Sequence, residues 1–251
     1  MMDDHKAMLE QVFGLSSDSE VEDSTLEDDR SLNHLVQNPI FQSVPQINGL
    51  WFCRDFLSSD QQYILLSTIR HEGWFEGASK NQNQAMRFGD LPAWSTELSD
   101  SIRELVLFSD DGFQGDGQTS ALPWDLLWRE PLFNQLIVNV YEPGEGICAH
   151  VDLLRFEDGI AIISLESSCV MHFSRVESAA DGVENEGKSD SSSTRVPILL
   201  APGSLVLMSG EARYNWKHEI NRKPGFQIWE GRELDQMKRT SITLRKLCPS
   251  E

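Results

Sequence analysis

Residues 137–152 read Ile-Val-Asn-Val-Tyr-Glu-Pro-Gly-Glu-Gly-Ile-Cys-Ala-His-Val-Asp, and the rest of the chain is organised around them. The stretch ends in His150 and Asp152, which are two residues apart, so on an extended chain their side chains point to the same face. One imidazole and one carboxylate can therefore bind the same metal ion. With one distant histidine they would complete the two-histidine, one-carboxylate set that leaves coordination positions open on non-haem Fe(II).

Polar side chains recur two residues apart on both sides of this pair. Asn139 and Tyr141 share one face of a predicted strand, and the Pro143-Gly144 that follows is typical of a turn. Near the C-terminus, residues 239–245 read Arg-Thr-Ser-Ile-Thr-Leu-Arg. This strict alternation predicts a strand whose polar face carries Arg239, Ser241, Thr243 and Arg245. A face with two arginines fits a cavity for an anion, because the planar guanidinium matches a carboxylate with two hydrogen bonds.

Together these motifs resemble the AlkB family of Fe(II)- and 2-oxoglutarate-dependent dioxygenases. The resemblance in order and spacing covers roughly residues 130–247, and it is looser over 46–130. It implies that O₂ is the oxidant and that iron is held by His150, Asp152 and His218. It further implies that the distal carboxylate of 2-oxoglutarate pairs with Arg239, and that the same co-substrate is contacted by Asn139, Tyr141, Ser241 and Arg245. Ser241 departs from the bacterial relatives, which have Asn there.

The chain has six histidines, so the third metal ligand has to be chosen among the five other than His150. His5 and His34 stand in or beside an acidic segment. His71 ends a predicted helix, where a cation complements the helix dipole. His172 stands on a predicted strand between apolar residues, so each of these four is better explained as structural or incidental. His218 follows a strand and precedes the last predicted strand, which is the order of the resembling family.

The pattern along the chain predicts an α+β fold that is mainly β. Ser58 and Gln61 form a capping box for a helix that Gly73 can end, and a second helix is expected with Ser95 or Thr96 as its N-terminal cap. We also expect a short helix over residues 122–133. Strands are predicted over residues 159–165, 169–176, 196–200, 204–208 and 239–245, with 196–200 and 204–208 forming a hairpin. Short strands with supporting helices on the N-terminal side indicate a double-stranded β-helix, or jelly roll, which the resemblance also implies.

With 251 residues, 39% of them hydrophobic, the chain can build one well-buried domain and a tail. We assign residues 46–251 to the dioxygenase domain and 1–45 to an acidic, disordered N-terminal tail. The tail is either a solvating segment or a site for a protein partner, through a short helix at 6–14 or phosphorylation of its serines. Residues 109–120 and the insert 177–194 are expected to be exposed loops.

Charge limits the possible substrates. The formal net charge is −19, and a protein that binds duplex nucleic acid tightly normally presents excess Lys and Arg. Residues 211–251 nevertheless hold nine Lys and Arg against six Asp and Glu, so the site end is locally basic. RNA or a single strand is therefore favoured over a duplex.

Candidate substrate contacts are Trp74, Arg87, Phe88 and Leu154. Leu154 is a departure, since some nucleobase-repairing members carry a polar or acidic residue there, and Glu219 replaces the glycine common after the distal histidine.

Three functions stay open from the sequence. The first is oxidative demethylation or hydroxylation of a modified nucleobase, in RNA or DNA. The second is oxidation of a protein or small molecule, and the third is an interaction module with little catalysis. No run of 18 apolar residues and no signal peptide is recognisable, so no membrane span is expected. The four cysteines lack C-x-x-C spacing and are expected to be reduced thiols. These features predict an intracellular protein of the nucleus, the cytoplasm or both.

Overall fold

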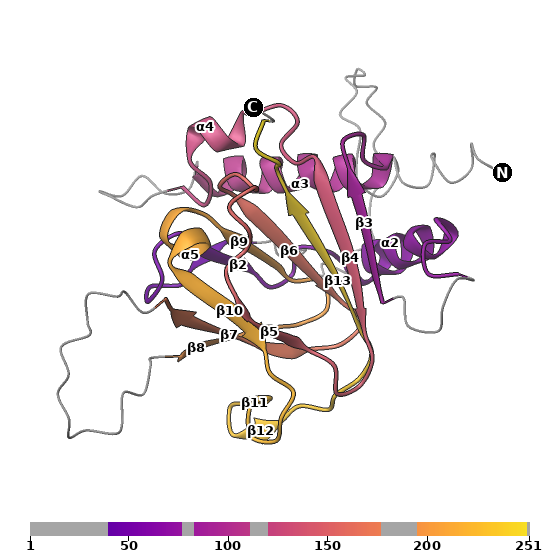
Figure 1. Cartoon of the computed structure of the whole chain (residues 1–251), viewed down its shortest axis with the longest axis vertical. Helices are drawn as coiled ribbons and strands as arrows, with labels where there is room; N and C mark the ends of the chain where they lie inside the picture. The colour runs from indigo at the N-terminus through magenta and orange to yellow at the C-terminus, as the bar shows by residue number, and fades with distance from the viewer. Residues whose placement is uncertain (1–39, 77–82, 111–119, 177–194, 250–251) are drawn as a thin grey trace, which may run out of the picture.

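The computed structural model describes residues 40–76, 83–110, 120–176 and 195–249 (Figure 1). The insert at 177–194, most of the loop at 109–120 and most of the predicted tail lie outside the described residues. Regular structure is present before residue 46. Phe41 is buried, and β1 (Gln42–Ser43) pairs with β2 (Leu50–Cys53).

The described residues form two large antiparallel sheets, with strand orders β1-β2-β9-β6-β13-β4-β3 and β5-β10-β7-β8 (Figure 1). The remaining strands of the larger sheet are β3 (Gln84–Phe88), β4 (Gln135–Tyr141), β6 (Ile160–Leu165), β9 (Leu205–Met208) and β13 (Arg239–Arg245). The smaller sheet comprises β5 (Ile147–His150), β7 (Cys169–Arg175), β8 (Arg195–Leu200) and β10 (Trp216–Ile220). A ribbon of β11 (Ile228–Trp229) and β12 (Arg232–Glu233) precedes β13. The predicted jelly roll is confirmed.

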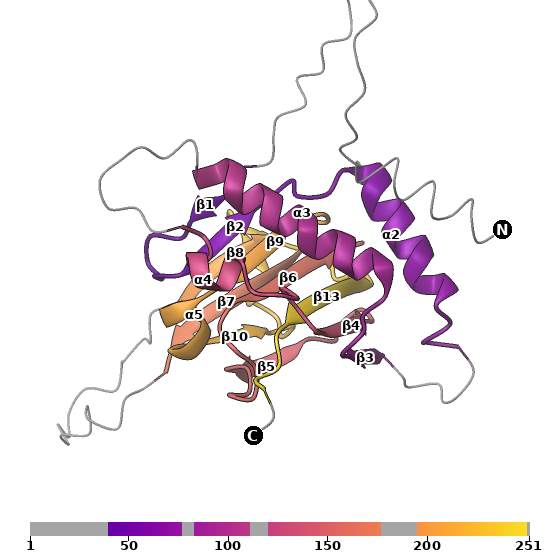
Figure 2. The same cartoon turned by 90° about the horizontal axis from the view of Figure 1, so that it is seen from above.

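Two helices, α2 (Ser59–His71) and α3 (Ala93–Asp110), cover the outer face of the larger sheet (Figure 2). The capping box predicted for α2 is present: Gln61 N donates to Ser58 Oγ at 3.2 Å, and Ser58 N donates to Gln61 Oε1 at 2.8 Å. This reciprocal pair satisfies two backbone N–H groups that a helix start leaves unpaired. Within the part of the chain that the structure describes, no helix is both long and apolar enough to cross a membrane.

Two helix predictions were wrong at their ends. The second helix begins at Ala93, before Ser95 and Thr96, because Pro92 provides its first turn: its carbonyl accepts from Ser95 N at 2.9 Å. Proline is favoured at a helix start, where its missing N–H costs nothing. The helix predicted over residues 122–133 is shorter, since α4 spans only Trp124–Leu127. Pro131 cannot donate the hydrogen bond that a longer helix would need.

The hairpin predicted from residues 196–200 and 204–208 does not exist. β8 pairs with β7 in the smaller sheet, whereas β9 pairs with β2 and β6 in the larger one. The turn between β8 and β9 contains Gly203, whose φ is 83° and whose N–H donates to Ser164 O at 2.7 Å. The turn therefore carries the chain from one sheet to the other, a connection that is typical of a jelly roll.

Apolar side chains form two layers, one under the helices and one between the sheets. The alternation predicted for β13 decides which side chains face each layer. Ile242 and Leu244 are fully buried under the helices, and each such side chain contributes roughly 1.5–3 kcal/mol to stability. Arg239, Ser241 and Arg245 face a pocket on the opposite side of the strand, toward the smaller sheet. The core thus holds the polar face of β13 in place.

Candidate metal and co-substrate site

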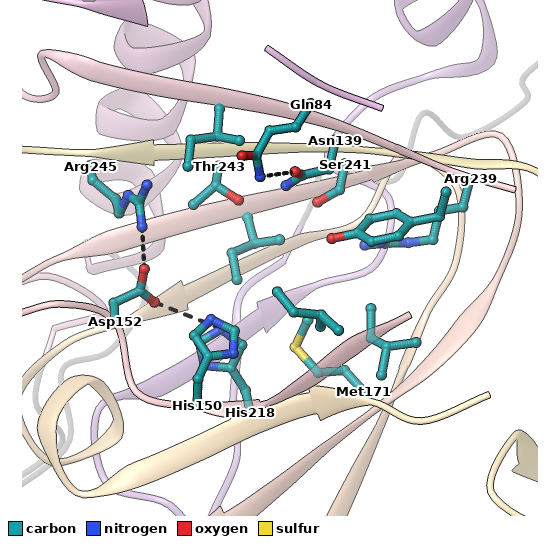
Figure 3. A pocket seen from close by; sticks show the side chains of 15 residues that line it. Gln84, Asn139, His150, Asp152, Met171, His218, Arg239, Ser241, Thr243 and Arg245 are labelled. Atoms are coloured by element: carbon teal, nitrogen blue, oxygen red, sulfur yellow. Dashed lines mark hydrogen bonds and ion pairs between the residues drawn. The ribbon is translucent and has the colours of Figure 1, made fainter. Parts of the chain in front are cut away.

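His150, Asp152 and His218 converge at one end of this pocket (Figure 3). Strands β5 and β10 pair so that His150 lies opposite His218, and their ring centroids are 4.3 Å apart. Asp152 follows β5, and its Oδ2 lies 3.7 Å from Nε2 of His218. One nitrogen or oxygen of each residue lies within 4.8 Å of the other two, a spacing that small side-chain rotations bring onto one ion. Two imidazoles and a carboxylate are the donors that Fe(II) takes in oxygenases, so the residues fit the metal.

Neighbouring groups orient two of these side chains. Nδ1 of His150 lies 2.8 Å from the carbonyl oxygen of Cys148, and as the donor of that hydrogen bond it leaves Nε2 free. Oδ1 of Asp152 accepts a hydrogen bond from Nη1 of Arg245, which leaves Oδ2 facing His218. Such partners fix the ring and carboxylate directions that a metal requires.

Burial and charge set the protonation states of the same groups. Burial and, to a lesser extent, the nearby His150 lower the pKa of His218 to about 4, because Asp152 opposes them only in part. His218 is therefore neutral at pH 7, which is the form that binds a metal. Burial raises the pKa of Asp152, but the charges of His218 and Arg245 outweigh burial and the net shift is downward. Because His218 is uncharged at neutral pH, Arg245 is the cation that keeps Asp152 ionised.

The pKa of His218 predicts that the metal-free protein loses stability in mild acid. The unfolded chain has the ordinary value of 6.5 and the folded chain about 4, so the unfolded state binds more protons between these values. This contribution is present above pH 6.5 and is lost as the pH falls toward 4. The shift corresponds to roughly 3 kcal/mol. Urea unfolding of the metal-free protein from pH 7 to 4 should show this loss, and His218→Gln should flatten the slope. If the free energy of unfolding depended equally on pH in the wild type and in His218→Gln, the loss would not come from His218.

The pocket between the sheets has a volume of about 160 Å³, well above the roughly 10–15 Å³ that one water needs. The guanidinium of Arg239 forms part of its wall at the other end from Asp152 and Arg245 (Figure 3). Arg239 is 1% exposed, and its Nε donates to Ser164 Oγ at 2.9 Å. Its Nη2 has no hydrogen-bond partner among the described residues. A buried cation without an anion is costly, so a carboxylate entering the pocket fits here.

The other residues predicted to contact 2-oxoglutarate also line the pocket: Asn139, Tyr141, Ser241 and Arg245. The register of β13 and β4 places Ser241 opposite Asn139 and Arg239 opposite Tyr141. Asn139 Oδ1 accepts from Nε2 of Gln84 at 2.6 Å. Arg245 lies nearer the metal end, where its Nε donates to Gln135 Oε1 at 2.7 Å and its Nη1 to Asp152.

The four candidate substrate residues separate into two pairs. Trp74 and Arg87 do not line the pocket. The Arg87 guanidinium lies 4.1 Å from the centroid of the Trp74 ring and donates to the carbonyl oxygen of Met86 at 2.8 Å. By contrast, Phe88 shares a face of β3 with the pocket residue Gln84, because side chains alternate along a strand. Phe88 is 47% exposed and Leu154 is 76% exposed, so these two remain open to a substrate.

Sequence reasoning missed Arg213, which lies in α5 (Gly210–Tyr214) and is 2% exposed. Its Nη1 donates to the carbonyl oxygen of Asp152 at 3.0 Å. Its Nη2 donates to those of Leu153 at 2.8 Å and Phe156 at 3.1 Å. The side chain therefore holds the loop that carries the carboxylate ligand candidate. No local motif marks an arginine that acts on a loop about sixty residues earlier in the chain.

Comparisons with known proteins agree with this geometry. The family model of the 2OG-Fe(II) oxygenase superfamily matches residues 49–245. The chain is 31% identical to the alpha-ketoglutarate-dependent dioxygenase alkB homolog 7, mitochondrial, of Bos taurus, over 73% of this chain and 90% of that protein. It is 28% identical to the alkylated DNA repair protein ALKBH8 homolog of Arabidopsis thaliana, over 88% of this chain and 65% of the relative. It is also 35% identical to the tRNA (carboxymethyluridine(34)-5-O)-methyltransferase ALKBH8 of Macaca fascicularis, over 79% of this chain and 30% of that relative.

The chain thus spans less than two thirds of the length of the two ALKBH8 relatives. Among solved structures, that of OsALKBH1 matches with a TM-score of 0.55 at 14% identity, over 82% of this chain and 99% of the other. This likeness shows the same fold. The chain belongs to the AlkB family of the 2OG-Fe(II) oxygenase superfamily, and it is a dioxygenase that uses Fe(II), 2-oxoglutarate and O₂.

Proposed function

We propose that this dioxygenase demethylates or hydroxylates a modified nucleobase, in RNA or in a single strand. In this proposal His150, Asp152 and His218 hold the iron, and Arg239 binds the distal carboxylate of 2-oxoglutarate. The observation that supports it best is the donor triad at one end of a pocket whose other end carries a buried, incompletely paired guanidinium.

Fe(II) held here would supply the chemistry that breaks a C–H bond of the substrate, with O₂ as the oxidant and 2-oxoglutarate as the co-substrate that is oxidised to succinate and CO₂. The protein contributes geometry and electrostatics. Arg245 keeps Asp152 ionised and correctly turned, and burial keeps His218 neutral. Arg213 holds the loop after Asp152. Because the site lies between two packed sheets, its groups are fixed before the substrate arrives, which is what preorganised catalysis requires.

The mouth of the site supports a base as the substrate. Phe88 and Met86 share a face of β3 with the pocket residue Gln84, and Leu154 follows the pocket residue Asp152 by two residues, so exposed apolar side chains lie close to residues that line the pocket. An exposed aromatic ring can stack a base without reading its sequence. The names of two relatives refer to nucleic acids, one to DNA repair and one to tRNA.

The charge distribution supports a single strand more than a duplex. The described residues hold 22 Asp and Glu against 17 Lys and Arg, so most of the net charge of −19 lies elsewhere in the chain. Residues 195–249 carry ten Lys and Arg against five Asp and Glu. This modest local excess of positive charge suits a few phosphate contacts, whereas tight duplex binding uses many.

A protein or small-molecule substrate is the second candidate. Leu153 and Leu154 are 61% and 76% exposed, and an apolar pair at this position offers no hydrogen bond to a base edge. Such a surface would suit an apolar side chain of a protein substrate equally well. The third possibility, an interaction module with little catalysis, is disfavoured by the complete donor triad.

One assay distinguishes these candidates. Fe(II)-loaded protein is incubated with 2-oxoglutarate in four separate reactions. Each reaction contains one possible substrate: N-methylated RNA, methylated single-stranded DNA, methylated duplex DNA or a protein extract. Substrate-dependent succinate and formaldehyde are measured. We expect stimulation by RNA or single-stranded DNA above duplex DNA. Stimulation by the protein extract alone would contradict the nucleobase proposal.

Phe88→Ala tests the stacking surface within the same assay. Loss of the ring should raise the KM for the oligonucleotide about tenfold, which is the lower part of the range for base stacking. Succinate formation without substrate should not change, because Phe88 does not line the co-substrate pocket. The matched control is Phe108→Ala, since Phe108 is 75% exposed but lies on α3 over the other face of the larger sheet. Equal effects of both variants would remove Phe88 from the substrate site.

A further inference from the structure

A second buried guanidinium, that of Arg222, lies in a neighbouring pocket that shares Ile147 and Ile220 with the co-substrate pocket. Arg222 lies two residues after the end of the strand β10 and is only 9% exposed. Its Nε donates to the carbonyl oxygen of Glu145 at 3.0 Å, and its Nη1 is buried without a hydrogen-bond partner among the described residues. No carboxylate in that part of the chain forms an ion pair with it. Arg222 and Arg239 are therefore two buried cations with the same unmet need for an anion.

The two guanidiniums are electrostatic neighbours around Tyr141. Burial lowers the pKa of Arg222 and the charge of Arg239 lowers it further, whereas Cys169 and Tyr141 oppose this in part. Burial raises the pKa of Tyr141, whereas the charges of Arg239 and Arg222 both oppose that rise. Tyr141 lines the pocket, and Arg239 stands at the other end from Asp152 and Arg245 (Figure 3). The end of the pocket away from the metal candidate thus carries two buried positive charges that the carboxylate of Glu145 offsets only in part, and like charges in a buried setting repel strongly.

Packing holds the Arg222 side chain in this position. A Cβ at Gly146 would lie 2.0 Å from the carbonyl oxygen of Ile220, so only glycine fits there, and the same Cβ would lie 3.2 Å from Cγ of Arg222, a tight contact. The backbone of Arg222 is also fixed, because its carbonyl oxygen accepts from Nε2 of Gln236 at 3.1 Å. The positive charge is therefore built into the structure, unlike that of a surface arginine that samples many rotamers.

We infer that Arg222 is a second positioning cation for 2-oxoglutarate: with Arg239 it stabilises the carboxylate remote from the iron, and so makes this pocket select a dianionic 2-oxo acid. The inference rests on the proposed placement of 2-oxoglutarate against Arg239. A carboxylate at that end relieves the repulsion between the two arginines and gains charge-assisted interactions. Arg222 acts by its charge, from behind the residues that line the pocket, and Arg239 makes the direct contact.

The test measures binding without turnover. Protein loaded with Mn(II) is titrated calorimetrically with 2-oxoglutarate and with 2-oxopentanoate, which keeps the 2-oxo acid head and ends in a methyl group. The variants are Arg222→Met, Arg222→Lys and Arg239→Met. The matched control is Lys223→Met, which removes one exposed cation from the next position. Comparing two ligands on one variant separates a lost charge interaction from general damage to the fold.

We expect Arg222→Met to weaken 2-oxoglutarate binding about tenfold and to leave 2-oxopentanoate binding unchanged. Arg222→Lys should restore most of the preference for the dicarboxylate, and Lys223→Met should resemble the wild type. Equal weakening of both ligands by Arg222→Met, or no weakening of either, would overturn the inference. If Arg239→Met loses the preference for 2-oxoglutarate over 2-oxopentanoate while Arg222→Met keeps this preference, only the role of Arg222 fails. If both variants keep the preference, the proposed placement of 2-oxoglutarate against Arg239 fails.

Discussion

Replacing His150 by alanine is expected to abolish the iron-dependent conversion of 2-oxoglutarate to succinate. The variant loses one of three donors that converge within 4.8 Å. Changes to residues that only support metal ligands already cost roughly 10–100-fold, so loss of a ligand itself should exceed that range. His150 is partly exposed, and within the described residues its side chain hydrogen-bonds to the carbonyl oxygen of Cys148 alone, so the fold should survive the change. The measurement is succinate formed per enzyme with and without Fe(II).

Asp152→Ala should have the same effect on turnover but needs a folding control. Arg245 is 8% exposed and forms an ion pair with Asp152, so removal of the carboxylate leaves a buried cation without its partner. Breaking a buried ion pair in this way costs about 3–5 kcal/mol. Asp152→Asn keeps the shape and a hydrogen-bond acceptor while removing the charge. Circular dichroism and thermal unfolding then separate loss of the ligand from loss of the fold. Iron-dependent succinate formation retained in folded His150→Ala or Asp152→Asn protein would refute the metal assignment.

Arg239→Leu is expected to raise the requirement for 2-oxoglutarate and to affect the rate at saturation much less. A hydrogen bond to a charged group contributes about 1.5–3 kcal/mol, which predicts a KM for 2-oxoglutarate about 10–100-fold higher. The guanidinium is fully buried, with a free Nη2 at the pocket wall, so it has no solvent contact to compensate for a lost anion. Initial rates of succinate formation across a 2-oxoglutarate series give both parameters.

The control for this variant is Arg232→Leu, which removes an exposed arginine on β12 and should leave the KM unchanged. An unchanged apparent affinity in Arg239→Leu would remove Arg239 from the co-substrate site. A collapse of the rate at saturation with an unchanged KM would also contradict its role as an anchor for the carboxylate.

The sequence allowed prediction of those parts of the site that depend on short-range periodicity. Two-residue spacing placed Asn139 with Tyr141 and predicted the face shared by Arg239 and Arg245, because a strand can present its side chains in only two directions. The capping box at Ser58 is equally local, since its two hydrogen bonds join residues three apart. The family resemblance then selected His218 as the distant histidine.

Features that depend on how strands are distributed between sheets could not be predicted in this way. A turn containing Gly203 suits both a hairpin and a crossing between sheets, and only the pairing of β8 with β7 and of β9 with β6 decides between them. Arg87 and Phe88 are adjacent in sequence, yet they face opposite sides of an edge strand. Arg213 and Arg222 act on residues about sixty and seventy-seven positions earlier in the chain, a separation over which no sequence pattern is informative.

The most direct test of the central claim is the metal content of His218→Ala compared with that of His172→Ala. Both histidines lie on neighbouring strands of the smaller sheet, but His172 does not line the pocket. After equilibrium dialysis against Fe(II) under anaerobic conditions, we expect the wild type and His172→Ala to bind one metal ion per chain. His218→Ala should bind it at least about 100-fold more weakly. Wild-type affinity and stoichiometry in folded His218→Ala protein would contradict the claim that these three side chains hold one iron.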